Sequence, residues 1–292
     1  VFSYELIPSY ALLDPELVMT SPASVAAACG VDALIHAWEA YTSRDASPFS
    51  DAMAEKAMEL IGANLRRFVA NRQDEEAAAA NFTNEGGYNG SVRFLKNIMG
   101  LWLIQESRRH WKRAGREYSF AELEKLACEC RPFESIIDVD DIRFSPPGDI
   151  PGRVQQFCRE SGQKVPETVG EIMQCIYCSL ALKYRDSFKN MEDICGVKFE
   201  TVHMVGGGIK DTLLCRLTAG ACGVPVTAGP VEATVIGNIA TQLMALGHIK
   251  SIEQARDIIA ASFPIEQYAP ENESEFAAAF EKYKAICTKT NN

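Results

Sequence analysis

Several features are scarce or absent in this sequence. It has no run of about 18 or more apolar residues, so no segment is expected to span a membrane. Basic residues are fewer than acidic ones, 29 against 39, and the net charge is -10. Nucleic-acid affinity comes largely from Lys and Arg that neutralise phosphates, so this balance argues against a nucleic-acid partner. The start, Val1–Glu5, lacks both the basic and the long apolar segment of a secretory signal, and we expect a cytoplasmic protein.

The 10 cysteines do not form the paired knuckles of a zinc site. The close pairs, Cys128/Cys130 and Cys175/Cys178, each stand alone, so we expect buried thiols in a reducing compartment. The remaining composition, 47% hydrophobic and 23% charged, is that of a globular protein. Disorder, collagen and coiled coil are excluded as descriptions of the whole chain.

The hydrophobic pattern predicts a helix-rich chain. Helices are expected over residues 22–43, 49–70, 91–115, 119–130, 151–161, 167–193, 210–221, 231–246, 251–262 and from 273. Strands are expected only at 201–205 and 224–228, where short β-branched runs meet glycine or proline. No obvious strand precedes residue 199, so the chain is expected to become α/β only in its last third.

Asp32 and His36 lie four residues apart in the first expected helix, which places both on one face. A carboxylate and an imidazole are good ligands for a divalent first-row metal. The same spacing also fits a helix-stabilising Asp–His pair, and spacing by itself favours that simpler interpretation.

The residues around this pair resemble the iron-containing (group III) alcohol dehydrogenases over 7–76. The matching runs are Ala11–Leu17 (ALLDPEL) and Gly30–Tyr41 (GVDALIHAWEAY). In that family the Asp and His of the second run are two of four metal ligands, so the resemblance makes Asp32 and His36 ligands for Fe or Zn. The other two family ligands are histidines in a Gly/His-rich stretch that this chain lacks, so we expect weak metal binding.

From Asn81 onward the sequence resembles the FGGY sugar kinases, and within them the rhamnulokinases. The matching runs are Asn81–Gly87 (NFTNEGG), Leu95–Leu103 (LKNIMGLWL), Val205–Gly208 (VGGG) and Ala228–Thr234 (AGPVEAT). The resemblance implies an actin-like, ribonuclease-H-like ATPase fold that uses ATP with Mg²⁺ to phosphorylate rhamnulose.

Together the two resemblances predict a fusion, α/β overall but helix-rich. An all-α piece over 1–76 is expected to join, through a junction at 77–80, an incomplete kinase domain over 81–292. Small sugar and nucleotide molecules are the implied partners.

Three residues inherit binding roles from the kinase resemblance. Asn97 is implied to contact the sugar, and Gln105 and Gly207 to contact ATP; the eight-residue spacing of the first two is expected to place them on one helix face. Glycines after a strand let a ligand approach the backbone and direct helix N–H groups toward it, although they also fit a simple tight turn. The family bonds two cysteines at the positions of Cys158 and Cys175, which we expect to be free in a reducing cytosol.

Several parts of a sugar kinase are missing, because the family's catalytic aspartate, its phosphate loops and its first three antiparallel strands would precede residue 81. We therefore expect a rhamnulokinase-like fragment without turnover, whose strands at 201–205 and 224–228 expose a sheet edge that favours self-association. Asp211 suits a helix start but would repel a nearby phosphate. Two alternatives remain open: an iron-dependent alcohol or lactaldehyde dehydrogenase fragment, and a non-catalytic nucleotide-binding or interaction protein.

Overall fold

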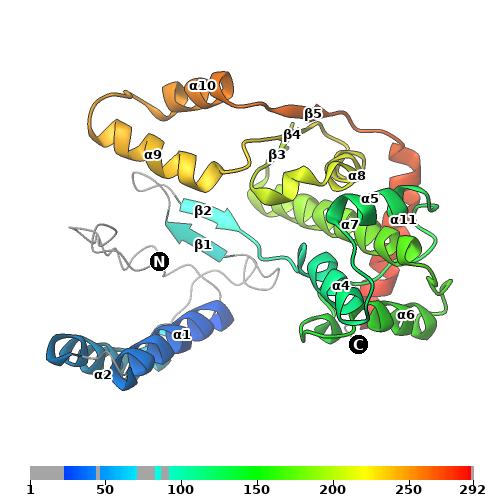
Figure 1. Cartoon of the computed structure of the whole chain (residues 1–292). Helices are drawn as coiled ribbons and strands as arrows, with labels where there is room; N and C mark the ends of the chain where they lie inside the picture. The colour runs from blue at the N-terminus through cyan, green and yellow to red at the C-terminus, as the bar shows by residue number, and fades with distance from the viewer. Residues whose placement is uncertain (1–22, 44–46, 71–82, 87–91, 291–292) are drawn as a thin grey trace. The chain divides into compact units, whose positions relative to one another are not determined.

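The chain divides into two compact units, residues 1–97 and 98–292 (Figure 1). The computed structural model describes residues 23–43, 47–70, 83–86 and 92–290. The division falls after Asn97, whereas the sequence predicted a junction at 77–80, which lies outside the described residues. Each unit is described by itself below.

The first unit contains a helical hairpin and a β-hairpin. Helices α1 (Ala23–Thr42) and α2 (Pro48–Ala70) occur where the sequence predicted them, and they pack against each other. Strands β1 (Thr83–Gly86) and β2 (Val92–Leu95) pair antiparallel, with Thr83 opposite Leu95.

The β-hairpin corrects two predictions. Residues 92–95 are a strand, and the helix expected over 91–115 begins only at Trp102. Gly100 lowers the helix propensity of the intervening stretch, and β1 supplies a pairing partner that periodicity cannot reveal. The expectation that no strand precedes residue 199 is therefore wrong.

The second unit has eight α-helices among its described residues. They are α4 (Trp102–Arg113), α5 (Phe120–Cys128), α6 (Ile150–Glu160), α7 (Val169–Cys195), α8 (Thr212–Cys222), α9 (Ala233–Ala245), α10 (Ile252–Ser262) and α11 (Glu273–Thr290). Two short 3₁₀ helices, η4 (Ile142–Phe144) and η5 (Gly207–Lys210), join them. Apart from α4, these helices agree with the predicted ones to within about two residues at each end, the usual uncertainty of a helix boundary.

Helix α7 is the centre of the core. It begins at a capping box in which the Thr168 hydroxyl accepts from Glu171 N–H, and it ends at Gly196, whose φ of 64° is left-handed. Its residues Met173, Ile176 and Leu180 are fully buried. Helices α4, α5, α6, α8 and α11 all contact α7, so the apolar face of this long helix is covered within the unit.

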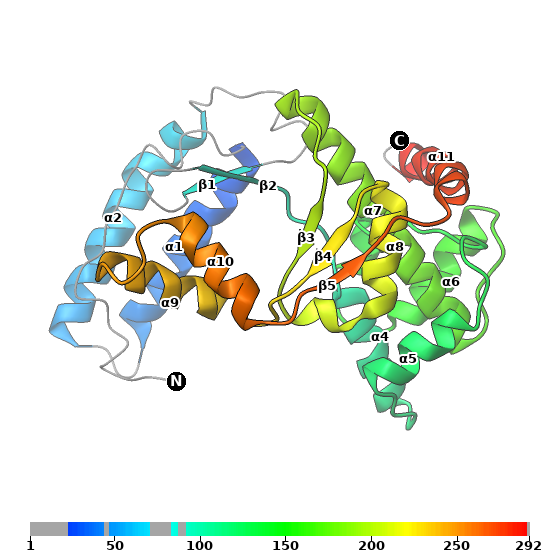
Figure 2. The same ribbon diagram turned by 90° about the horizontal axis from the view of Figure 1, so that it is seen from above.

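A three-stranded sheet lies beside α8, as Figure 2 shows. Strand β3 (Val202–Met204) is parallel to β4 (Val226–Ala228), and β5 (Glu266–Tyr268) is antiparallel to β4. The two predicted strands thus pair with each other, and β4 lies in the middle of the sheet and does not form the exposed edge that the sequence predicted for it. Strand β5 was missed because its sequence, Glu-Gln-Tyr, is polar and forms a strand only through pairing with β4.

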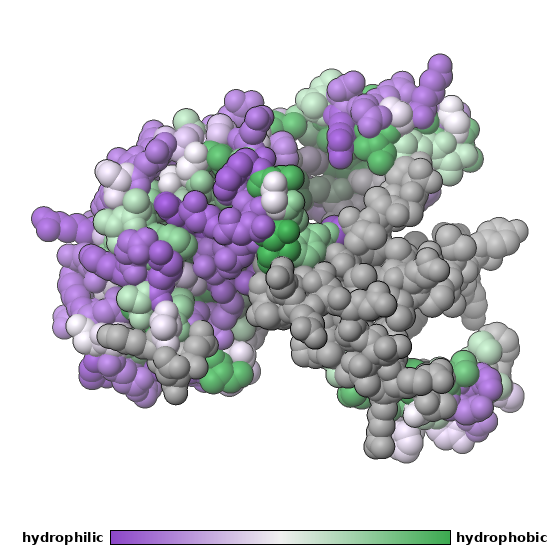
Figure 3. All heavy atoms as spheres, turned by 180° about the vertical axis from the view of Figure 1, so that it is seen from behind, coloured by the Kyte–Doolittle hydropathy of each residue, from purple (hydrophilic) through white to green (hydrophobic). Residues whose placement is uncertain are grey.

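Helices α9 and α10 extend away from the other helices of this unit (Figure 1). No residue of α9 is buried, and Val235 and Ile239 are 56% and 52% exposed. Figure 3 shows hydrophobic and hydrophilic residues side by side at its upper right, where α9 and α10 lie. Within the described ranges, no helix is long and apolar enough to cross a membrane.

Candidate functional site

A pocket of about 700 Å³ lies where α4, α5 and η5 meet in the second unit. It is called the Gln105 pocket below. Its lining residues are Leu101, Ile104, Gln105, Phe120, Ala121, Glu124, Gly207, Gly208, Lys210 and Asp211. The structure therefore brings together two residues singled out from the sequence, Gln105 and Gly207, although they are far apart along the chain.

The glycine turn after β3 forms one wall of the pocket. Gly206 has φ 86° and ψ -176°, a conformation that side chains rarely adopt, so glycine is required there by the turn. Gly207 is different, because a Cβ added to it would meet nothing within 4 Å. The turn itself does not demand glycine at 207. The open space above this backbone is what the close approach of a ligand needs.

Two carboxylates occupy the start of α8 at the base of the pocket. Asp211 Oδ1 accepts from Leu214 N–H at 3.1 Å, and Glu124 Oε1 accepts from Leu213 N–H at 2.8 Å and from the Thr212 hydroxyl at 2.6 Å. These N–H groups are therefore already bonded, which corrects the expectation that the helix start is directed at a ligand. An anion placed there would meet two carboxylates instead.

Asp211 is further held by Tyr177 of α7. The Tyr177 hydroxyl donates to Asp211 Oδ2, and burial raises the pKa of both groups. Asp211 thus links the long central helix to the floor of the pocket. Its carboxylate has structural partners on both oxygens, so it is not free to serve as a catalytic base.

The opposite wall is largely apolar. Leu101, Ile104 and Ala121 line it together with Phe120, whose side chain is 49% exposed. The Arg108 guanidinium lies over the Phe120 ring, 4.8 Å from its centroid. An apolar wall with a few polar groups, in a cavity of this size, is typical of small-molecule and cofactor sites.

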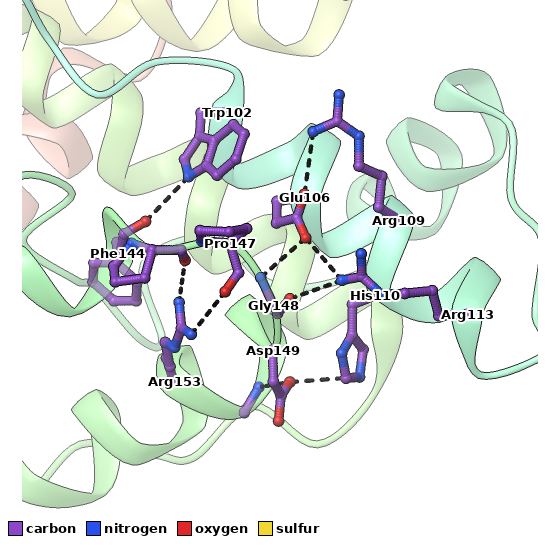
Figure 4. Close-up of polar contacts among 12 residues, drawn as sticks. Trp102, Glu106, Arg109, His110, Arg113, Phe144, Pro147, Gly148, Asp149 and Arg153 are labelled. Carbon is purple, nitrogen blue, oxygen red and sulfur yellow. Dashed lines mark hydrogen bonds and ion pairs between the residues drawn. The ribbon is translucent and has the colours of Figure 1, made fainter.

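The loop that holds α4 in place packs around a buried carboxylate (Figure 4). Glu106 is 1% exposed and accepts hydrogen bonds from Arg113 at 2.8 Å, Arg109 at 3.1 Å and the Gly148 backbone N–H at 3.0 Å. The Arg113 guanidinium is the main reason that the pKa of Glu106 is lowered. Trp102 Nε1 also donates to the Phe144 carbonyl at 3.1 Å. Because Glu106 directly follows Gln105, these bonds fix the helix that presents Gln105 to the pocket.

Asn97 does not share a helix face with Gln105. Asn97 is exposed in the stretch after β2 and belongs to the first unit, whereas α4 begins at Trp102 in the second. The expected common face is wrong because the helix starts five residues after Asn97. The implied role of Asn97 as a sugar contact stays a prediction.

Asp32 and His36 lie together on α1, with 3.7 Å between Asp32 Oδ2 and His36 Nδ1. Their side chains are 69% and 70% exposed, and no group of three or more metal-ligating side chains occurs among the residues with described placement. Two exposed donors do not make the four-ligand site that holds zinc or iron tightly. That Asp32 and His36 bind a metal ion weakly, if they bind one, stays a prediction. Cys158 and Cys175 are both buried and free.

Sequence reasoning missed Phe120 and Glu124. A signal for α5 was present, because Ser119 and Glu122 form a capping box just before the apolar run. That signal locates the helix start but does not reveal that Glu124 caps α8, nearly 90 residues later.

Comparison with known families gives two matches. Residues 65–246 match the C-terminal domain of the FGGY family of carbohydrate kinases. Residues 26–90 match the C-terminal part of the Fe-containing alcohol dehydrogenase family. The two matches overlap over 65–90, so the position of the join at 77–80 stays a prediction.

Curated relatives and solved structures agree with the first match. Rhamnulokinase of Bacteroides thetaiotaomicron is 42% identical over 209 residues, and that of Ligilactobacillus salivarius is 44% identical over the same length; each match covers 72% of this chain. Xylulose kinase from Rhodospirillum rubrum superimposes with a TM-score of 0.53 at 15% identity, over 75% of this chain and 43% of that enzyme. The chain spans 42% of the length of these two rhamnulokinases. The predicted fold class, a helix-rich chain with part of an actin-like domain, is confirmed.

Proposed function

Because this chain belongs to the FGGY family of carbohydrate kinases, we propose that its second unit is the nucleotide-binding part of a rhamnulokinase-type kinase. The observation that carries this proposal is the Gln105 pocket, where Gln105 and Gly207 line one cavity of about 700 Å³. A soluble cytoplasmic location, and rhamnulose as the sugar, are parts of the same proposal.

The pocket suits the adenosine part of ATP better than its phosphates. The half-exposed Phe120 ring and the aliphatic wall offer an apolar surface to a purine. The space above the Gly207 backbone allows the purine to come close to the main chain. The Glu124 carboxylate accepts hydrogen bonds, as ribose hydroxyls and base amino groups require. Lys210 is the one cation among the described lining residues and lies exposed at the rim, so the phosphates are expected to lie toward Lys210.

Bound ATP would supply the γ-phosphate for transfer to a sugar hydroxyl, but we propose that this chain does not carry out that transfer by itself. The step requires a base for the attacking hydroxyl and a clamp on the phosphates. The two carboxylates of the pocket are bonded to the first turn of α8 and are not placed to serve as that base. The chain is therefore proposed to bind nucleotide without turnover.

Nucleotide binding can be tested by calorimetry on the full chain with ADP and adenosine. Gly207→Val fills the space above the backbone. It is expected to raise the dissociation constants of ADP and adenosine at least tenfold, which corresponds to about 1.4 kcal/mol of binding free energy. Lys210→Ala is expected to weaken ADP while leaving adenosine unchanged, because only ADP carries phosphates. Gly237→Val on exposed α9 is the matched control, since a Cβ there also meets nothing within 4 Å.

Two results would contradict the proposal. The first is ADP binding that Gly207→Val leaves intact, which would place the nucleotide elsewhere. The second concerns activity: a coupled assay with rhamnulose, ATP and Mg²⁺ should show no turnover, so turnover that copurifies with the chain would show that a base had been overlooked.

We also propose that the chain self-associates. Strand β3 forms one edge of its sheet, and the apolar residues of α9 are exposed. Unpaired strand edges and uncovered apolar surface both favour association. Light scattering after size exclusion is expected to give more than one chain per particle, and Ile239→Lys on α9 is expected to reduce that mass. A monodisperse monomer that binds no hydrophobic dye would rule the proposal out.

A further inference from the structure

A second cavity, of about 850 Å³, opens between the 138–143 loop, α7 and α11. It shares no lining residue with the Gln105 pocket and is called the Asp138 cavity. Its lining residues are Asp138, Asp140, Asp141, Ile142, Arg143, Lys183, Asp186, Tyr283, Lys284, Cys287 and Thr288. Neither the proposed nucleotide site nor the resemblances assign it a role.

One buried hydroxyl in this cavity has no adequate partner. Tyr283 of α11 is only 2% exposed, and its hydroxyl bonds to no nitrogen or oxygen among the described residues. The Cys287 thiol is a weak neighbour on the same helix, and burial raises the pKa of both groups. A buried hydroxyl that lacks a hydrogen-bond partner destabilises the folded chain. A ligand group that bonded Tyr283 would remove this destabilisation.

The cations of the cavity mostly have partners already. Lys183, nearly buried on α7, lies 2.8 Å from Asp140. Arg143 lies 3.0 Å from Asp141 and 2.7 Å from Glu160. These three ion pairs neutralise one side of the cavity, and the Lys183–Asp140 pair holds the 138–143 loop against α7.

Two carboxylates of the cavity have fewer or longer hydrogen bonds and ion pairs than the others. Asp138 is 7% exposed, and among the described residues its carboxylate accepts one hydrogen bond, from the Asp140 backbone N–H at 3.1 Å. Asp186 lies 3.9 Å from Lys183 and accepts from Asn190 at 3.4 Å. Burial raises the pKa of Asp138, although the Asp140 backbone N–H and the charge of Lys183 act in the opposite direction. Asp138, Asp186 and Tyr283 all line this cavity, so the acceptors and the buried hydroxyl belong to one site.

We propose that the Asp138 cavity binds a neutral polyhydroxylated molecule the size of a sugar alcohol. An anion would meet four carboxylates, and a cation would meet Arg143, Lys183 and Lys284. A hydroxyl group avoids both conflicts, because it donates to a carboxylate such as Asp138 and accepts from the Tyr283 hydroxyl. The volume lies in the range of small-molecule sites and far exceeds that of a single ion.

The test is saturation-transfer NMR on the full chain, with sorbitol as the neutral probe, putrescine as the cation and sulfate as a competing anion. Tyr283→Phe removes only the hydroxyl and keeps the ring stacked on Phe280. It is expected to raise the dissociation constant of sorbitol about tenfold, which is the effect of losing one hydrogen bond to a ligand. Tyr268→Phe is the matched control, because that hydroxyl bonds Glu266 outside the cavity.

Asp186→Asn, at a half-buried position, gives a second variant and is also expected to weaken sorbitol. Loss of the sorbitol signal in both cavity variants, with the signal retained in Tyr268→Phe, would support the site. Equal binding by Tyr283→Phe and Tyr268→Phe would overturn it. So would the absence of sorbitol binding, or a preference for putrescine or displacement by sulfate.

Discussion

Replacing Glu106 by alanine is expected to lower the free energy of unfolding of the second unit by about 3 kcal/mol. The substitution removes the acceptor for two arginines and for the Gly148 backbone, and hydrogen bonds to a charged group contribute about 1.5–3 kcal/mol each. Both arginines are more than half exposed, so water compensates part of the loss. Urea denaturation followed by circular dichroism measures the change.

Glu117→Ala is the matched control. Glu117 pairs with Lys112 at 2.5 Å, but both side chains are more than 60% exposed, and water and salt screen an exposed ion pair so that it contributes little to stability. If the two variants lose equal stability, the buried network around Glu106 does not hold the loop as described.

At low pH the wild type and Glu106→Gln should have the same free energy of unfolding. The pKa of Glu106 is lower in the folded chain than in the unfolded chain. Its ionised form therefore adds stability above the ordinary carboxylate pKa, and this contribution is lost as the pH falls through the lowered value. The two proteins should differ most near pH 7 and converge in strong acid.

Replacing Gly220 by alanine is expected to lower the free energy of unfolding by about 2–3 kcal/mol. Gly220 lies on α8, where an added Cβ would be 2.8 Å from the Glu271 carbonyl oxygen and would clash with the Phe276 ring. The carbonyl belongs to the backbone and cannot turn aside, so α8 and the start of α11 must separate. Overpacking of this kind typically costs about 1–3 kcal/mol.

The control for Gly220 is Gly237→Ala, which should act in the opposite direction. Gly237 also lies within a helix, but its added Cβ would meet nothing within 4 Å. Alanine is about 1 kcal/mol more favourable than glycine inside a helix, so this variant should be equally or more stable. A stable Gly220→Ala protein would show that α8 and α11 are not in close contact.

The helices were predictable because their signals are local. The Thr168/Glu171 capping box and the left-handed Gly196 bound α7, and both can be recognised from neighbouring residues. Strands β1, β2 and β5 could not be predicted in this way. Each depends on pairing with a segment elsewhere in the chain, and β5 has neither alternation nor β-branched residues to mark it.

The residues of the candidate sites also divide into those that the sequence reveals and those that depend on tertiary packing. Gln105 and Gly207 were found through the kinase resemblance, and the structure then placed them in one pocket. Glu124 could not be foreseen, because its partners on α8 come from tertiary packing. The acidic run at 138–141 is visible in the sequence, but Tyr283, which completes that cavity, lies on the last helix.

The chain segment that carries α9 and α10 leaves the sheet at the end of β4 and returns to it at the adjacent start of β5. Ala228, at the end of β4, pairs with Glu266, at the start of β5, so the chain between these residues closes a loop on itself. In topological terms residues 229–265 are an insertion within a β-hairpin. The three strands do not need this insertion for their pairing, and a tight turn could connect β4 to β5 directly. The start of this insertion is tied to the sheet, because the Pro230 carbonyl accepts from Gly206 N–H and Gly229 N–H donates to the Met204 carbonyl. Only the part beyond Pro230, which carries α9 and α10, is thus a separable module whose length can vary while the sheet that carries the glycine turn keeps its register.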